Sequence, residues 1–211
     1  IMSEVSFANQ WRHHSGFHYP RSYDTIQEIK TTKSAFEALY GDFIHRHAPS
    51  YFCPSATGVE IPAERYLAAC SSNYLSFNFE YPPAGTLNRD AVSLSLRTDE
   101  GVYDFHGLKK RLASDLEEAP NVALYTGSEI VNAELLSNGQ KRIVYRNANG
   151  EFSETVDYLI CATYANRNLL AQWFEFPVEP LRFDLYEMLV LRVPMPQICI
   201  TIIDGPFTSL V

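Results

Sequence analysis

The sequence has few cysteines, and none of them forms a closely spaced pair. Cys53, Cys70, Cys161 and Cys199 are far apart, so no CxxC motif occurs. This spacing disfavours a site built from paired cysteines. Cys161 and Cys199 lie inside apolar runs, where a small buried thiol is typical. We therefore expect a reducing, cytoplasmic setting.

Clustered positive charge and long apolar runs are also scarce. The chain has 17 basic and 25 acidic side chains, which give a net charge of −8. Its main basic cluster is residues 109–111, whereas nucleic-acid binding needs extended groups of Lys and Arg. No stretch approaches the roughly 18–20 apolar residues that a membrane span requires. Neither nucleic acid nor a membrane is therefore expected as a partner.

What is present is a composition typical of a folded protein: 211 residues, 46% of them hydrophobic and 20% charged. This length suffices for one large domain or two interleaved small ones. Helical patterns occur in three places. One begins after Ser22, which can cap it, and ends at Gly41. A second follows Asp104, with apolar residues at helical spacing to Leu116, and a short third one covers residues 168–173.

Strand patterns occupy much of the remaining chain. In the first half, residues 51–53 and 74–81 are mainly apolar, and Val92, Leu94 and Leu96 alternate with polar residues. Later, Asn138-Gly139 and Asn149-Gly150 each permit a tight turn, so residues 130–136, 142–146 and 152–156 predict a three-stranded β-meander. Further apolar runs predict strands at 122–125, 158–162, 185–193 and 198–203. The pattern as a whole predicts an α/β fold.

The opening segment, residues 1–21, has an unusual density of polar and aromatic side chains. Asn9 and Gln10 can form hydrogen bonds, and Arg12 and Arg21 can hold an anion. His14, His18 and Tyr19 add further polar groups, and Gly16 permits close approach of the backbone to a ligand. Because loops on a rigid scaffold often carry function, we interpret this segment as a binding site.

Three segments resemble the FAD-dependent oxidoreductases of the D-amino-acid oxidase superfamily, which includes glycine oxidase and L-2-hydroxyglutarate dehydrogenase. Residues 6–19 are similar to the family's loop that passes the flavin. Residues 104–156 are similar to the second half of its FAD domain, and 158–166 to its strand beneath the dinucleotide. The family's GxGxxG turn and C-terminal segment are absent, and Ala162-Thr163-Tyr164-Ala165-Asn166 replaces its usual Ala-Gly turn. The resemblance therefore implies an internal part of a longer protein.

The resemblance implies part of a Rossmann-like FAD-binding domain with the β-meander, interleaved with a mostly antiparallel, β-rich substrate domain. The FAD domain would comprise residues 1–47 and 98–173, and the substrate domain residues 48–97 and 174–211. The implied reaction is hydride transfer to FAD from the C–N or C–O carbon of a small amino or hydroxy compound. The small-molecule substrate is the expected partner.

The resemblance also implies roles for individual residues. The expected cofactor-binding residues are Ser6, Asn9, Gln10, Arg12, Gly16, Ile130, Ala162 and Thr163. The expected catalytic residues are His14, His18, Tyr19 and Arg21. Among these, His14 and Gly16 would lie beside the isoalloxazine ring, where an imidazole can stabilise negative charge on the reduced flavin.

Two other interpretations of the sequence stay open. The histidines at 13, 14 and 18, or those at 45 and 47, could belong to a metal site, although no acidic residue near the first group is an obvious third ligand. Alternatively, the chain could be a non-catalytic interaction domain, since a flavoprotein-like fold does not guarantee turnover.

Overall fold

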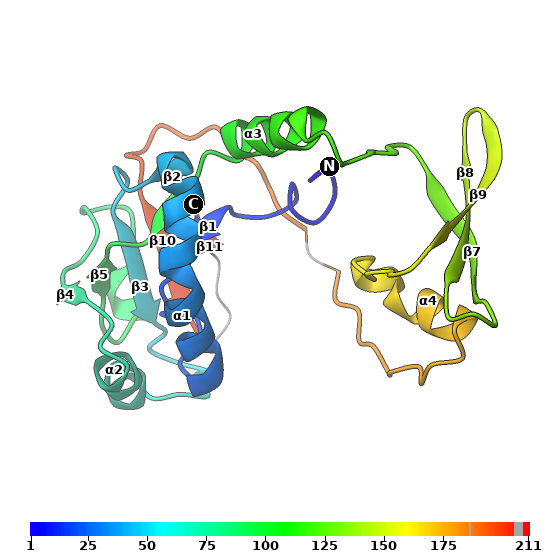
Figure 1. Ribbon diagram of the computed structural model, residues 1–211. Coiled ribbons are helices and arrows are strands. Elements are labelled where there is room, and N and C mark those ends of the chain that lie inside the picture. The colour runs from blue at the N-terminus through cyan, green and yellow to red at the C-terminus, as the bar shows by residue number, and fades with distance from the viewer. Residues whose placement is uncertain (186, 205–208) are drawn as a thin grey trace. The chain divides into compact units, whose positions relative to one another are not determined.

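The computed structural model describes residues 1–185, 187–204 and 209–211, and it divides into two compact units. The first unit consists of Ile1–Asp115 together with Met188–Val211, and the second consists of Leu116–Glu187. Figure 1 identifies the elements of both. Helices accompany antiparallel and mixed sheets, so the predicted α/β class is confirmed at this level.

A mixed five-stranded sheet forms the centre of the first unit (Figure 1). Its order is β11 (Ser209–Leu210), β10 (Cys199–Ile203), β3 (Ser50–Pro54), β5 (Leu96–Thr98) and β4 (Phe77–Phe79). β10 runs parallel to β3, and the other neighbours are antiparallel. The buried side chains packed on it include Phe17, Phe52, Tyr66, Cys70, Leu96 and Ile203.

A smaller antiparallel sheet in the same unit has the order β1 (Arg12–His13), β6 (Gly101–Tyr103) and β2 (Ile44–His45). Helix α1 (Tyr23–Tyr40) begins as predicted, because the Ser22 Oγ accepts a hydrogen bond from the Thr25 N–H at 3.3 Å, and it ends at Gly41. Helix α3 (Phe105–Glu118) also begins as predicted, where the Asp104 carboxylate accepts from the Gly107 N–H at 2.9 Å.

Helix α2 (Ala63–Ser72) was not predicted, because residues 47–97 were interpreted as strands and turns. Tyr66 and Cys70, four residues apart, form its buried stripe, while Glu64 occupies the first turn and Pro62 precedes it. Pro62 and Glu64 are typical of helix starts, so the signal was present but short. Between α1 and α2 lies a 3-10 turn (Gly41–Phe43), and a second one (Arg89–Ala91) precedes β5.

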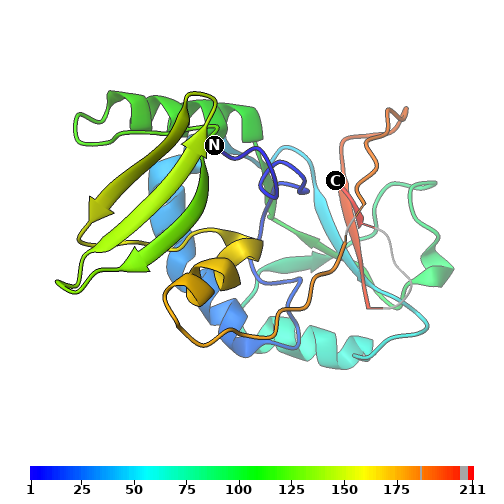
Figure 2. The same cartoon turned by 90° about the vertical axis from the view of Figure 1, so that its right-hand side faces the viewer.

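The second unit contains the antiparallel sheet β7 (Glu129–Leu135), β8 (Lys141–Asn147) and β9 (Gly150–Val156), with the order β7-β8-β9. Its three strands lie side by side in Figure 2. The two turns fall at the Asn-Gly pairs, where Gly139 and Gly150 have φ angles of +86° and +129°. Helix α4 (Arg167–Trp173) follows a 3-10 turn (Tyr164–Asn166), and Ala133 of β7 is buried.

Three predicted strands are wrong. Residues 122–125 and 158–162 form no ladder, and neither do the described residues among 185–193. The side chains of Tyr158 and Ile160 are 89% and 88% exposed. An apolar run becomes a buried strand only when neighbouring strands pair with it, and these segments have no such neighbours. Cys161 is exposed for the same reason, contrary to the expected buried thiol.

Two broader features follow from the pairings. Among the described residues, β3 and β10 form the one parallel pair, so the Rossmann-like sheet implied by the resemblance stays a prediction. The division into an FAD domain and a substrate domain likewise stays a prediction. In the described part of the chain, none of the helices combines the length and apolar character required to cross a membrane.

Candidate functional site

Arg12 is a buried cation, and two of its three guanidinium nitrogens lack a hydrogen-bond partner. It lies on β1 with 7% of its surface exposed, and its Cζ is 5.3 Å from the centre of the Phe52 ring. Its Nη1 donates to the Thr201 hydroxyl on β10, whereas its Nε and Nη2 are buried without a partner. Nε and Nη2 form one edge of the guanidinium, the edge that binds a carboxylate or phosphate with two parallel hydrogen bonds.

The charge of Arg12 is partly balanced by its surroundings. Burial lowers the pKa of Arg12 below its ordinary value, and the nearby Glu100 opposes that shift. Burial also raises the pKa of the Cys199 thiol on β10, while the guanidinium acts in the opposite direction. Arginine nevertheless stays protonated in proteins. The centre of the first unit therefore holds a fixed positive charge with unused donors.

Glu100 is a buried carboxylate between β5 and β6, with 3% of the residue exposed. Its Oε1 accepts a hydrogen bond from the Ser15 N–H at 2.6 Å. Its Oε2 lies 3.7 Å from the His14 Nδ1, and each of these two atoms is buried without a hydrogen-bond partner. The carboxylate of Glu100 and the imidazole of His14 thus face each other, and each has one buried atom without a hydrogen-bond partner.

His14, His18 and Tyr19 form a cluster of rings beside these groups. The His14 ring centre lies 5.7 Å from that of His18 and 5.9 Å from that of Tyr19, and the latter two are 5.4 Å apart. Burial lowers the pKa of His18, and the charges of His14 and Arg12 act in the same direction. His18 is therefore held as a neutral imidazole near neutral pH, with a buried Nδ1 that has no partner.

His13 belongs to a separate network. Its Nδ1 is 2.7 Å from the Tyr103 hydroxyl, and its Nε2 is 2.8 Å from the Glu37 Oε1. Glu37 also accepts from the Arg46 Nη2 at 2.6 Å. Both ring nitrogens of His13 are engaged, so it ties β1 to α1 and β6 and offers nothing to a ligand.

The other predicted residues of the loop have structural partners. Asn9 accepts a hydrogen bond from the Trp11 N–H at 3.1 Å, and the Ser6 carbonyl accepts from the Trp11 Nε1 at 3.2 Å. Ser6 and Asn9 are exposed, and Gln10 is half-buried. Gly16 has φ +116°, and a Cβ there would lie 3.1 Å from the Ile26 Cγ2, so packing against α1 accounts for this glycine.

Arg21, the second expected anion-binding residue, is already paired with acidic groups. It forms an ion pair with Glu60, and its Nη1 lies 3.5 Å from the Asp204 Oδ1. More than half of its side chain is exposed. Ile130, Ala162 and Thr163 belong to the second unit, with Ile130 on β7 and the other two in the exposed segment after β9.

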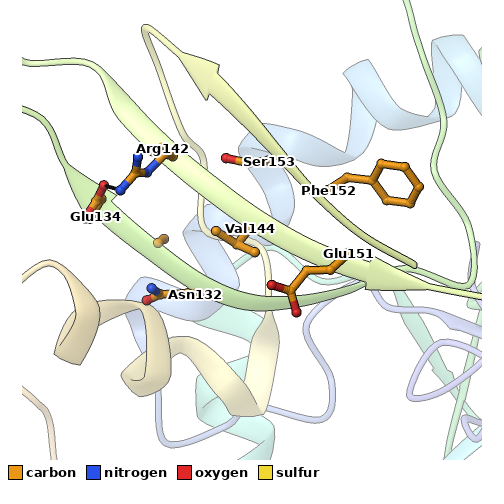
Figure 3. Close-up of a pocket in the computed structure, with 8 residues that line it drawn as sticks. Asn132, Glu134, Arg142, Val144, Glu151, Phe152 and Ser153 are labelled. Carbon is orange, nitrogen blue, oxygen red and sulfur yellow. Dashed lines mark ion pairs between the residues drawn. The ribbon is translucent and has the colours of Figure 1, made fainter. Parts of the chain in front are cut away.

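Two open hollows lie elsewhere on the chain. One, of about 430 Å³, is lined by Arg21, Glu60, Arg65 and their neighbours. The other, of about 300 Å³, lies on one face of the β7–β9 sheet, where Figure 3 shows Glu134 beside Arg142. The charges in this second hollow are paired, Glu134 with Arg142 and Glu151 with Arg146. Neither hollow contains unpaired buried groups like those of Arg12 and Glu100, so we assign the site to the latter.

Three residues of the cluster were not expected from the sequence: Glu100, Cys199 and Thr201. Glu100 falls in the segment 98–101, whose sequence predicts a turn. The signal that could have identified it is the two-residue period of Leu96, Thr98 and Glu100, all of which are buried. Cys199 and Thr201 lie on a predicted strand, but nothing in the sequence relates that strand to Arg12.

The chemistry of the site is that of an anion receptor with a neighbouring proton-transfer group. The buried edge of Arg12 offers two donors, Glu100 an acceptor, and the two histidines groups that can gain or lose protons. Among the described residues, no three His, Cys, Asp or Glu side chains are arranged to hold a metal ion. Comparison with known proteins found no family model that matches the sequence and no significantly similar curated protein.

Proposed function

We propose that this chain is part of a flavin-linked oxidoreductase that acts on a small amino or hydroxy acid, in line with its resemblance to the D-amino-acid oxidase superfamily. The observation that carries the proposal is the unused Nε and Nη2 edge of Arg12, which is buried near Glu100 and His18. An unpaired buried charge is costly, so such a group is expected to have a ligand. The matching ligand group is a carboxylate or a phosphate.

FAD carries phosphate groups, and the unused donors of Arg12 would suit one of them. The donors of Arg12 suit a phosphate of the cofactor or the carboxylate of a substrate, and both fit the same two-hydrogen-bond geometry. When bound, the flavin would supply the hydride acceptor. The tasks of this chain's own residues would be to hold the anionic group, exclude water from the buried cluster and provide polar side chains beside the reacting carbon.

The test uses the full natural protein and replaces Arg12 by Lys and by Met. Lys keeps the positive charge but lacks the two parallel N–H donors. Met keeps much of the side-chain length but has neither the charge nor the donors. If Arg12 binds the cofactor, both variants should retain less FAD after gel filtration. If it binds the substrate, FAD should be retained and the substrate KM should rise at least tenfold.

The matched control is Arg21→Lys, because this arginine is exposed and paired with Glu60. It should alter neither FAD retention nor KM. Arg12 variants that fold and match the wild type in both measurements would remove the central support of the proposal. Zinc recovered at one equivalent from a protein without flavin would favour the metal interpretation instead.

A further inference from the structure

We propose that Glu100 is a positioning residue that fixes the tautomer of His14, with the proton on Nδ1 and the lone pair on Nε2. The contact between the Glu100 carboxylate and the His14 imidazole is a feature of the structure. Its role toward a substrate rests on the function proposed above. Glu100 is distant in sequence from the polar loop, and its part in the site is visible only in the folded chain.

With an ionised Glu100, the geometry favours one assignment of protons. The Glu100 side chain is 1% exposed, and the Ser15 N–H occupies its Oε1. The free Oε2 lies 3.7 Å from the His14 Nδ1, and both atoms are shielded from solvent. An ionised carboxylate can only accept hydrogen bonds, so the nitrogen that faces it has to bear the hydrogen.

The separation of 3.7 Å exceeds a normal hydrogen bond, but a small rotation of the imidazole would close it. Hydrogen bonds between catalytic groups are often long before a ligand is bound and shorten in the complex. His14 has room for this movement, because 31% of its side chain is exposed. Glu100 has little room, since its other oxygen is held by the backbone.

This tautomer gives the His14 Nε2 a defined task. Oxidation of an alcohol or amine carbon removes a hydride from carbon, for which a bound flavin would be the acceptor, and a proton from oxygen or nitrogen. Nε2 accepts that proton as the C=O or C=N bond forms. The resulting imidazolium is stabilised by the negative charge of Glu100, as in other pairs of carboxylate and histidine.

The tautomer can be measured directly in the full natural protein labelled with ¹⁵N-histidine. Long-range ¹H–¹⁵N correlation spectra distinguish protonated from unprotonated ring nitrogens, and a His14→Gln variant identifies the His14 signals. In mildly alkaline buffer, the wild type should show His14 with a proton on Nδ1 and none on Nε2.

Replacing Glu100 by Gln should reverse the tautomer. The amide oxygen is expected to keep the hydrogen bond from the Ser15 N–H, which turns the amide NH₂ toward the His14 Nδ1. That nitrogen then has to accept, so the proton moves to Nε2. The same variant should lower kcat about 10- to 100-fold with little change in KM. Glu60→Gln, at an exposed carboxylate, should change neither the tautomer nor kcat.

A wild-type His14 protonated on Nε2, or on both nitrogens, would overturn the proposal. This measurement uses the wild-type protein, so it does not depend on whether any variant folds. An unchanged tautomer in a folded Glu100→Gln protein would also overturn it. The result is separable from the proposed function, because the spectrum requires no turnover. A protein that binds no flavin but shows the expected tautomer would keep the pairing of Glu100 with His14 and lose the oxidoreductase function.

Discussion

Arg12 and His13 are adjacent residues of β1, yet their buried side chains connect to different parts of the first unit. Arg12 donates to Thr201 on β10 in the five-stranded sheet, whereas His13 contacts Glu37 on α1 and Tyr103 on β6. Successive side chains of a strand point to opposite faces, so two residues suffice for both connections. The network of His13 therefore fixes the backbone from which Arg12 reaches the site.

This relationship predicts that His13 contributes mainly to stability. His13→Ala should lower the free energy of unfolding by about 2–4 kcal/mol, because it leaves a cavity and removes two part-buried hydrogen bonds, to Tyr103 and Glu37. Urea unfolding followed by fluorescence measures the effect. His45→Ala, at an exposed histidine, should stay within about 0.5 kcal/mol of the wild type. Equal stability of the two variants would contradict the anchoring role of His13.

The pKa shifts predict that the fold loses stability in mild acid. Burial lowers the pKa values of His13 and His18 below the ordinary 6.5. The unfolded chain thus binds protons at a higher pH than the folded chain, so stability is complete above about pH 6.5 and is lost as the pH falls toward the folded pKa values. The Tm should fall between pH 7 and pH 5.

A further loss of stability is expected at lower pH from Glu37, whose pKa is lowered by its hydrogen bond to His13. The stability that Glu37 contributes is present above the ordinary glutamate pKa and disappears as the pH falls through the lowered pKa.

Replacing His13 and His18 together by Gln should flatten the Tm profile between pH 7 and pH 5. A profile that keeps the wild-type slope would mean that other groups take up the protons.

Replacing Gly16 tests whether this glycine is needed for packing against helix α1 or for binding a ligand. Gly16→Ala should destabilise the fold by about 1–3 kcal/mol, since φ is +116° and the added Cβ would lie 3.1 Å from the Ile26 side chain. Gly41→Ala is the control, because a Cβ there meets nothing within 4 Å. Thermal unfolding distinguishes the two variants. If Gly16→Ala were as stable as Gly41→Ala, the packing explanation for this glycine would be wrong.

The sequence predicted those features that depend on neighbouring residues. Ser22 and Gly41 bound α1, Asp104 begins α3, and the turns of the β7–β9 sheet lie at the Asn-Gly pairs, because capping and turn formation are local. Residues 122–125 and 158–162 were predicted wrongly, since an apolar run does not reveal whether a partner strand will pair with it.

The candidate site was predictable to a similar extent. The dense polar loop indicated Arg12, His14, His18 and Tyr19. The last three are neighbours in the folded chain, and Arg12 lies near enough to His18 for its charge to act on that ring. Glu100 and Thr201 could not be paired with that loop, because the contact between Arg12 and Thr201 joins residues 189 positions apart. The ion pair of Arg21 with Glu60 could not be predicted either, since Glu60 becomes its neighbour only through the fold.

The most direct test of the account is the visible absorbance spectrum of the purified full natural protein, recorded before and after denaturation. The proposed flavin cofactor should give a flavin band near that of free FAD, released on denaturation in about one equivalent per chain. A colourless protein that takes up no added FAD would contradict the central claim, whatever the behaviour of Arg12 and His14.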